Sequence, residues 1–123
     1  MVMKENVVIL GASEKKDRYS NIAIGRLKEA GYSVLPVNPK LHQIDGVKVY
    51  NDLSEIQFTI HTLTVYVNPS LLEKNIAKIK ELNPKRVILN PGTRSEKAKL
   101  ELKNRGIQVV EACTLVMLST NEF

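Results

Sequence analysis

Short apolar runs alternate with helix-like segments along this chain. Five runs have the length of buried strands, and the segments between them carry apolar residues three or four positions apart. This alternation is typical of successive β-α-β units, which place parallel strands in one sheet. The expected strands are Asn6–Leu10, Ser33–Val37, Leu63–Val67, Arg86–Leu89 and Gln108–Val110.

The segments between the strands carry helix signals. The expected helices cover Ser20–Ala30 with Ser20 as N-cap, Pro69 or Ser70 to Leu82, and Ser95–Arg105. The stretch between the second and third strands is less regular, with a turn at Gly46 and a short helix over Asp52–Ile56. Right-handed crossovers then predict an α/β, Rossmann-like open parallel sheet of about five strands, in the order 3-2-1-4-5, with helices on both faces.

Length and composition place the chain among ordinary globular proteins. With 123 residues, 43% of them hydrophobic and 25% charged, residues 1–123 are expected to form a single domain. Met1–Asn6 leads directly into a strand, and no apolar run has the length of a membrane span, so we expect no membrane association and a cytoplasmic location. One cysteine excludes an internal disulfide and a thiolate zinc cluster, and we expect no metal.

The net charge of +5 favours anionic partners. Aromatic residues make up only 5% of the chain and Trp is absent, which argues against a nucleic-acid surface with aromatic platforms. The charge by itself does not choose among anionic partners, but we expect no nucleic-acid partner.

The turns that follow the strands are the candidate ligand site, because doubly wound sheets bind ligands at the carboxyl ends of their strands. The series is Gly11-Ala12-Ser13, Asn38-Pro39-Lys40, Asn68-Pro69-Ser70 and Asn90-Pro91-Gly92-Thr93. The first turn, with Arg18 and a helix start at Ser20-Asn21, is typical of a phosphate site. It lacks the G-x-G-x-x-G fingerprint, and no acidic residue follows the second strand, so it indicates a phosphate-bearing nucleotide ligand other than ordinary NAD.

The ordered series resembles a known family. Gly11-Ala12-Ser13, Arg18, Tyr32 with Val37-Asn38-Pro39, Tyr66-Val67-Asn68-Pro69 and Glu111-Ala112-Cys113 resemble the stand-alone CoA-binding domain proteins. That family is similar to the N-terminal CoA-binding domain of the succinyl-CoA synthetase alpha subunit. The chain departs from many members at Leu89-Asn90-Pro91-Gly92-Thr93, where they carry a Trp-containing stretch with Gln-x-Gly.

The resemblance implies that coenzyme A or an acyl-CoA binds across the strand ends. Phosphates would lie on the first turn and the helix start, with charge from Arg18 or Lys40, and the adenosine beside the second strand. The turn after the third strand would border the phosphate or pantetheine region, and the turn after the fourth would line the far end. The implied ligand residues are Gly11, Ala12, Ser13, Arg18, Ser20, Asn21, Val37, Asn38, Pro39, Lys40, Tyr66, Val67, Asn68, Pro69, Asn90 and Gly92.

Catalytic signals are sparse. His42 and His61 have no triad or metal-site spacing, and Glu111 has no carboxylate partner in sequence. Cys113 follows the last strand and is either a buried structural cysteine or a redox or CoA-disulfide group. The first hypothesis is therefore a CoA-binding protein without catalysis of its own. The alternatives are a small NAD(P)- or thiol-dependent enzyme using Cys113, and a ligand-sensing regulatory module, as a homodimer or with another protein partner.

Overall fold

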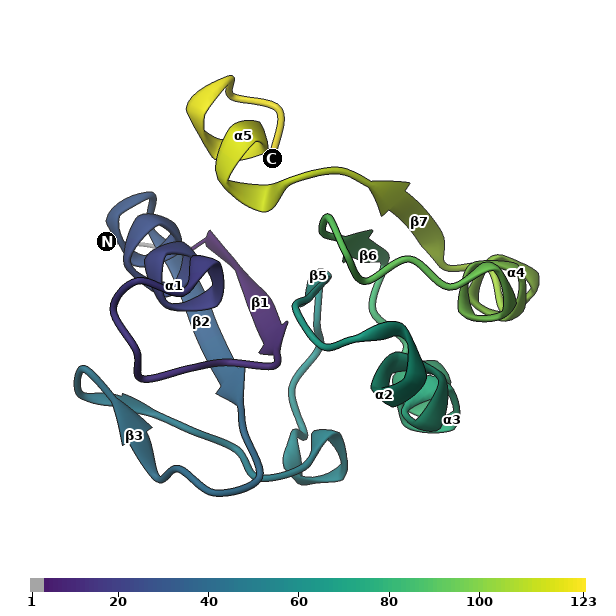
Figure 1. Cartoon of the computed structure of the whole chain (residues 1–123), viewed down its shortest axis with the longest axis horizontal. Helices are drawn as coiled ribbons and strands as arrows, with labels where there is room; N and C mark the ends of the chain where they lie inside the picture. The colour runs from purple at the N-terminus through teal and green to yellow at the C-terminus, as the bar shows by residue number, and fades with distance from the viewer. Residues whose placement is uncertain (1–3) are drawn as a thin grey trace.

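The computed structural model describes residues 4–123, and it confirms the α/β class and the five-stranded parallel sheet (Figure 1). All four pairings between neighbouring strands are parallel. The strands are β1 (Lys4–Leu10), β2 (Tyr32–Val37), β5 (Thr62–Val65), β6 (Arg86–Leu89) and β7 (Gln108–Glu111). Two further short strands, β3 (Gln43–Ile44) and β4 (Val47–Lys48), form a hairpin that turns at Gly46.

The predicted strand order was wrong. The observed order is β2-β1-β5-β6-β7, or 2-1-3-4-5 for the five predicted strands, because the third strand pairs with β1 and not with β2. The outer edge of β2 is taken by Tyr50, whose N–H donates to Pro36 O while its carbonyl accepts from Asn38 N. The connection that follows packs Leu53 and Ile60 on the sheet face opposite the first helix. From β2 the chain therefore crosses over β1 on that face, in the usual right-handed sense, and enters the sheet as β5 on the other side of β1.

The helices begin and end close to the predicted positions, with two differences. They are α1 (Tyr19–Glu29), α2 (Pro69–Lys74), α3 (Ile76–Leu82), α4 (Glu96–Asn104) and α5 (Thr114–Ser119), with a 3-10 turn, η1, over Leu53–Glu55. Ser20 is not the N-cap of the first helix: Arg18 holds that position in extended backbone, and Ser20 lies buried inside α1. The helix expected up to Leu82 is interrupted at Asn75, which ends α2 and precedes α3.

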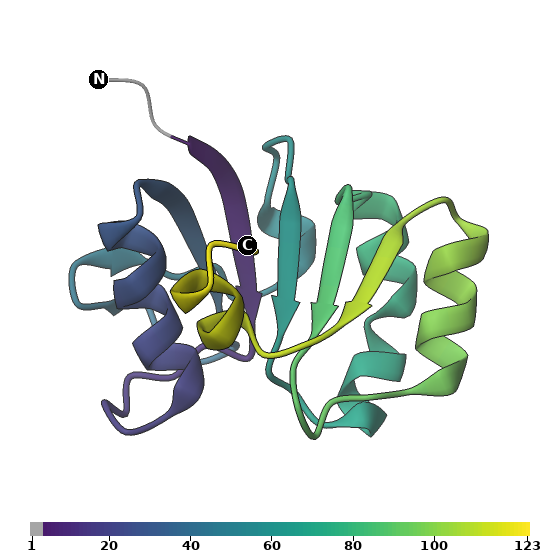
Figure 2. The ribbon, with the colours of Figure 1, turned by 90° about the horizontal axis from the view of Figure 1, so that it is seen from above.

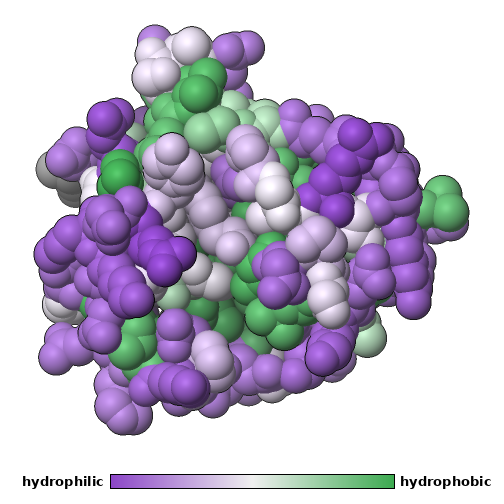
Figure 3. Space-filling view, in the orientation of Figure 1, coloured by the Kyte–Doolittle hydropathy of each residue, from purple (hydrophilic) through white to green (hydrophobic). Residues whose placement is uncertain are grey.

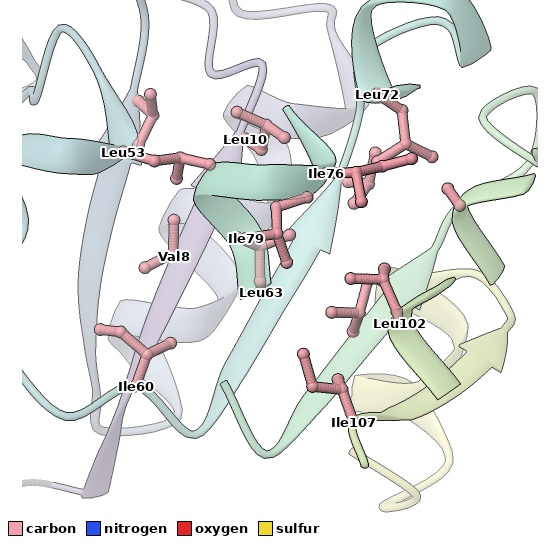
Figure 4. Close-up of a cluster of buried hydrophobic side chains, with 14 of the residues drawn as sticks. Val8, Leu10, Leu53, Ile60, Leu63, Leu72, Ile76, Ile79, Leu102 and Ile107 are labelled. Carbon is pink, nitrogen blue, oxygen red and sulfur yellow. The ribbon is translucent and has the colours of Figure 1, made fainter. Parts of the chain in front are cut away.

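Helices cover both faces of the sheet, as predicted (Figure 2). On one face, side chains from α2, α3, α4 and η1 pack against alternate residues of the strands to form the larger core cluster (Figure 4). On the other face, α1 packs Ala23, Ile24 and Leu27 against Val7 and Ile9 of β1, and α5 adds Leu115 and Leu118. Because successive strand residues point to opposite faces, each strand contributes side chains to both clusters. The helices cover the two faces of the sheet, and the loops lie at the ends of the strands.

Candidate functional site

Three pockets adjoin one another along the carboxyl edge of the sheet, which is the lower edge in Figure 2 and faces the viewer in Figure 1. We name them by position: the β2-side pocket, of about 290 Å³, the central pocket, of about 260 Å³, and the β7-side pocket, of about 320 Å³. Gly11 lines the first two and Pro91 the last two. In the space-filling view of this face, apolar surface shows in the middle between hydrophilic residues (Figure 3).

The first turn of the site is fixed by backbone contacts. The N–H groups of Gly11 and Ala12 both donate to Val37 O, at 3.3 and 3.0 Å. Gly11 has a φ of +95°, which L side chains rarely adopt, and a Cβ placed there would lie 2.9 Å from Val67 Cγ1. The turn therefore brings the β1 exit directly against the β5 exit, at the point where the strand order reverses.

The central pocket lies at the start of α1. Its lining includes Gly11, Ser13, Arg18 and Ser20 from the β1–α1 segment. Within residues 4–123, no side chain caps the first turn of α1. The N–H groups of that turn and the positive end of the helix dipole are therefore left to a ligand, and a phosphate or carboxylate is the group they suit.

The opposite wall of the central pocket comes from Tyr66, Pro91 and Thr93. Burial raises the pKa of Tyr66, and the nearby hydroxyls of Thr114 and Thr64 lower it only in part. Those hydroxyls bond to each other at 2.7 Å, and the buried Tyr66 hydroxyl has no hydrogen-bond partner of acceptable geometry among the described residues. Tyr66 thus stays a neutral phenol that contributes its ring to this wall.

The β2-side pocket combines apolar walls with charged groups at its rim. Its apolar lining consists of Leu10, Val37, Pro39, Leu53, Val67 and Leu71, and its polar lining of Asn51, Asp52, Lys74, Asn75 and Lys78. Lys78 Nζ lies 2.6 Å from Asp52 Oδ1, and this hydrogen bond is the main cause that lowers the pKa of Asp52 to about 2. A flat apolar ring fits such walls, with polar groups placed at its edge.

The β7-side pocket is bounded by the turn after β6 and by the segment that leads from β7 into α5. Its lining includes Asn90, Gly92, Arg94, Glu111 and Cys113. Glu111 is held by Arg94 Nε at 2.9 Å and by Lys99 Nζ at 3.3 Å. Arg94 also pairs with Glu96, so two cations face two carboxylates here. The pocket therefore carries little net charge and suits an uncharged group.

The structure divides the predicted ligand residues into two groups. Ten of them line at least one of the three pockets: Gly11, Ser13, Arg18, Ser20, Val37, Pro39, Tyr66, Val67, Asn90 and Gly92. The remaining six, Ala12, Asn21, Asn38, Lys40, Asn68 and Pro69, line none of the three pockets.

The asparagines of the strand-end turns bind the protein's own backbone. Asn38 Nδ2 donates to Ala12 O at 2.9 Å, and Asn21 Nδ2 donates to Ser13 O at 2.8 Å. Asn68 Oδ1 accepts from Leu71 N and caps α2. These side chains hold the turns in place, a role for which asparagine is suited because it carries both a donor and an acceptor.

Asn90 is the most deeply embedded of them. Its Nδ2 donates to Thr64 Oγ1 at 2.7 Å and to Val65 O at 2.8 Å, and its Oδ1 accepts from Thr114 N at 2.9 Å. The residue is 3% exposed. Asn90 therefore ties β5, β6 and the start of α5 together, and its side-chain amide is fully used by the fold.

Sequence reasoning missed the pocket residues that do not follow a strand. Asn51 to Leu53 come from the irregular segment before β5, and Leu71, Lys74 and Lys78 come from α2 and α3. The regular spacing of Leu71, Lys74 and Lys78 is a helical signal that could have placed them on one face. Tyr19, 71% exposed, borders the central pocket without any signal in its local sequence.

Fold and site together define a doubly wound α/β protein whose pockets lie at the strand-order reversal. Residues 5–119 match the family model of a CoA binding domain, and the chain belongs to this family. Within residues 4–123, no helix has the length and apolar character to cross a membrane.

Individual proteins are also similar to this chain. The uncharacterized protein YneT of Bacillus subtilis (strain 168) is 27% identical over 106 residues, which are 86% of this chain and 78% of that protein. An ADP-forming acetate–CoA ligase of Methanocaldococcus jannaschii is 21% identical over 117 residues, which are 95% of this chain but 17% of the ligase. A crystal structure of an uncharacterized protein superposes with a TM-score of 0.87 and 37% identity, covering 100% of both chains.

Proposed function

We propose that this protein binds coenzyme A or an acyl-CoA in an extended form along the three pockets, without catalysis of its own. The observation that carries the proposal is the line of adjoining pockets with the uncapped start of α1 in its middle. The CoA binding domain family and the CoA ligase among the relatives support the choice of ligand. The adenosine is assigned to the β2-side pocket, the diphosphate to the central pocket and the pantetheine to the β7-side pocket.

The diphosphate is the part of the ligand that the central pocket suits best. Backbone N–H groups at the start of α1 donate to phosphate oxygens, and the helix dipole adds a favourable field. Arg18, Ser13 and Ser20 line the same pocket. A charged hydrogen bond from Arg18 would contribute about 1 to 3 kcal/mol to binding.

The two outer pockets suit the two ends of the ligand. Val37 and Pro39 on one side and Val67 on the other give the β2-side pocket apolar walls for an adenine ring. The near-neutral β7-side pocket accepts a thiol or a short uncharged acyl group.

A binding role is favoured over a catalytic one by the state of the titratable groups. Glu111 and Asp52 are both paired with cations, and neither His42 nor His61 lines one of the three pockets. Cys113 does line the β7-side pocket, which is the observation that favours the thiol-dependent alternative. In the binding-only proposal, Cys113→Ser changes CoA affinity less than about twofold; cofactor-dependent turnover that this variant abolishes would favour the alternative.

The proposal is tested by isothermal titration calorimetry of the reduced protein with CoA, acetyl-CoA, NAD and ATP in parallel. We expect saturable binding of the two CoA species that is tighter than that of NAD or ATP. Arg18→Ala should weaken CoA binding by about 5- to 150-fold, the equivalent of 1 to 3 kcal/mol. The matched control is Arg105→Ala, an exposed arginine that follows α4 and lines none of the three pockets.

Two results would overturn the proposal. One is the absence of saturable heat with CoA in protein shown to be folded by its cooperative unfolding. The other is selective binding of NAD. Light scattering with and without CoA separates simple binding from a sensor, because a ligand-dependent change in mass indicates regulated assembly.

A further inference from the structure

The charges at the rim of the β2-side pocket do not cancel. Three charged side chains line this pocket, Asp52, Lys74 and Lys78. Lys78 and Asp52 neutralise each other across 2.6 Å. Lys74 forms no ion pair within residues 4–123, so it supplies the one uncompensated charge of this pocket in the described part of the chain.

The break between α2 and α3 keeps both lysines at the pocket. Lys74 is the last residue of α2, and Asn75 then bonds through its side chain to Leu71 O and through its N–H to Leu72 O. Residues four apart along a helical segment lie on the same side, so Lys74 and Lys78 both face the pocket although Asn75 separates them. Lys78 is held by Asp52, whereas Lys74, unpaired within residues 4–123, is free to bind an anion.

Lys40, which the family resemblance offered as a charge for the phosphates, does not line the β2-side pocket. It is exposed on the turn after β2, its N–H bonds to Asn38 Oδ1, and its side chain lines none of the three pockets. A free cation therefore borders the β2-side pocket from α2 and not from the β2 turn.

From this charge arrangement, and resting on the proposed function, we infer that Lys74 recognises the ribose 3′-phosphate of CoA. The adenosine assigned to the β2-side pocket carries this phosphate in CoA, whereas dephospho-CoA, NAD and ATP lack it. A phosphate monoester carries between one and two negative charges at neutral pH. Its pairing with the unneutralised Lys74 ammonium makes Lys74 the residue that distinguishes CoA from dephospho-CoA.

The test compares calorimetric affinities for CoA and dephospho-CoA across a set of variants. The wild-type protein should prefer CoA by about tenfold, the range of one charged hydrogen bond. Lys74→Met, which keeps most of the side-chain volume, should lose this preference by weakening CoA about tenfold while changing dephospho-CoA less than twofold. Lys74→Arg should restore the preference, and Lys85→Met, an exposed lysine just before β6 at the other edge of the sheet, should keep it.

The outcomes separate this inference from the proposed function. If the wild-type protein binds neither compound, the proposed function fails and the inference falls with it. If it binds both equally, or if Lys74→Met weakens both by the same factor, CoA binding stands and the inference is overturned. Loss of the preference in Lys40→Met, with Lys74→Met unchanged, would also overturn it by assigning the phosphate to the β2 turn.

Discussion

Replacing Gly11 with alanine tests the close approach of the β1 and β5 exits. At a φ of +95°, an L residue costs about 1 to 3 kcal/mol. The new Cβ would also meet backbone, with Val67 N at 3.0 Å and the Tyr66 carbonyl carbon at 3.1 Å, so the segment that follows β5 must shift, which costs about 1 to 3 kcal/mol more. Alanine also restricts the unfolded chain more than glycine does, and this effect offsets about 0.4 to 1 kcal/mol of the loss. Gly11→Ala should therefore lower the free energy of unfolding by about 2 to 5 kcal/mol.

Gly92→Ala is the matched control, because it isolates the cost of the backbone conformation. Gly92 has a φ of +88° and nothing within 4 Å of the added Cβ, so only the backbone cost applies, about 1 to 2 kcal/mol after the unfolded-state gain. Urea denaturation with a shared slope gives both values. A loss for Gly11→Ala no larger than that for Gly92→Ala would refute the argument that contact between the two strand exits fixes the turn.

Three further predictions use the same unfolding assay. Asn90→Ala removes three buried hydrogen bonds and should lower the free energy of unfolding by about 2 to 4 kcal/mol; a loss below about 1 kcal/mol would contradict the role given to this amide. Tyr66→Phe deletes a buried hydroxyl that has no hydrogen-bond partner among residues 4–123 and should change stability by less than about 1 kcal/mol, whereas a larger loss would reveal a bond not formed in this geometry. The lowered pKa of Asp52 contributes stability that is present above its ordinary value of 3.8 and lost as pH falls through about 2, so Asp52→Asn should reduce the loss of stability between pH 4 and pH 2; equal losses in both proteins would exclude the Lys78 pair as a contributor.

The apolar pattern predicted which segments form strands but could not predict where the third strand pairs. Both β2 and β5 are apolar runs that fit beside β1, and alternation of apolar residues does not encode which edge a strand joins. The order is decided by the segment between them, where Tyr50 occupies the outer edge of β2 and Leu53 packs on the opposite face from α1. These contacts join residues far apart in the sequence, so the local sequence pattern does not predict them.

Local signals were also ambiguous at the ends of helices. Ser20 has the residue type of an N-cap, yet the helix starts one residue earlier and buries the Ser20 side chain. The apolar spacing of Leu72, Ile76 and Ile79 continues through the break at Asn75, so periodicity predicts a single helix. In both cases the same apolar residues can be buried whether or not the helix ends at the predicted position. The local pattern therefore does not fix the end of the helix, and tertiary packing does.

The strand-end asparagines show why residue type at a site does not by itself define a ligand contact. Asn38, Asn68 and Asn90 all follow strands, and each uses its side chain on the protein's own backbone. Backbone N–H groups at the start of α1 are thereby left for the ligand. If a substitution at Asn90 weakens CoA binding, the cause can be a disordered turn after β6 as well as a lost contact with the ligand. Binding losses at this edge are therefore assigned to the ligand only when the unfolding free energy of the same variant is unchanged, as expected for Lys74→Met and not for Asn90→Ala.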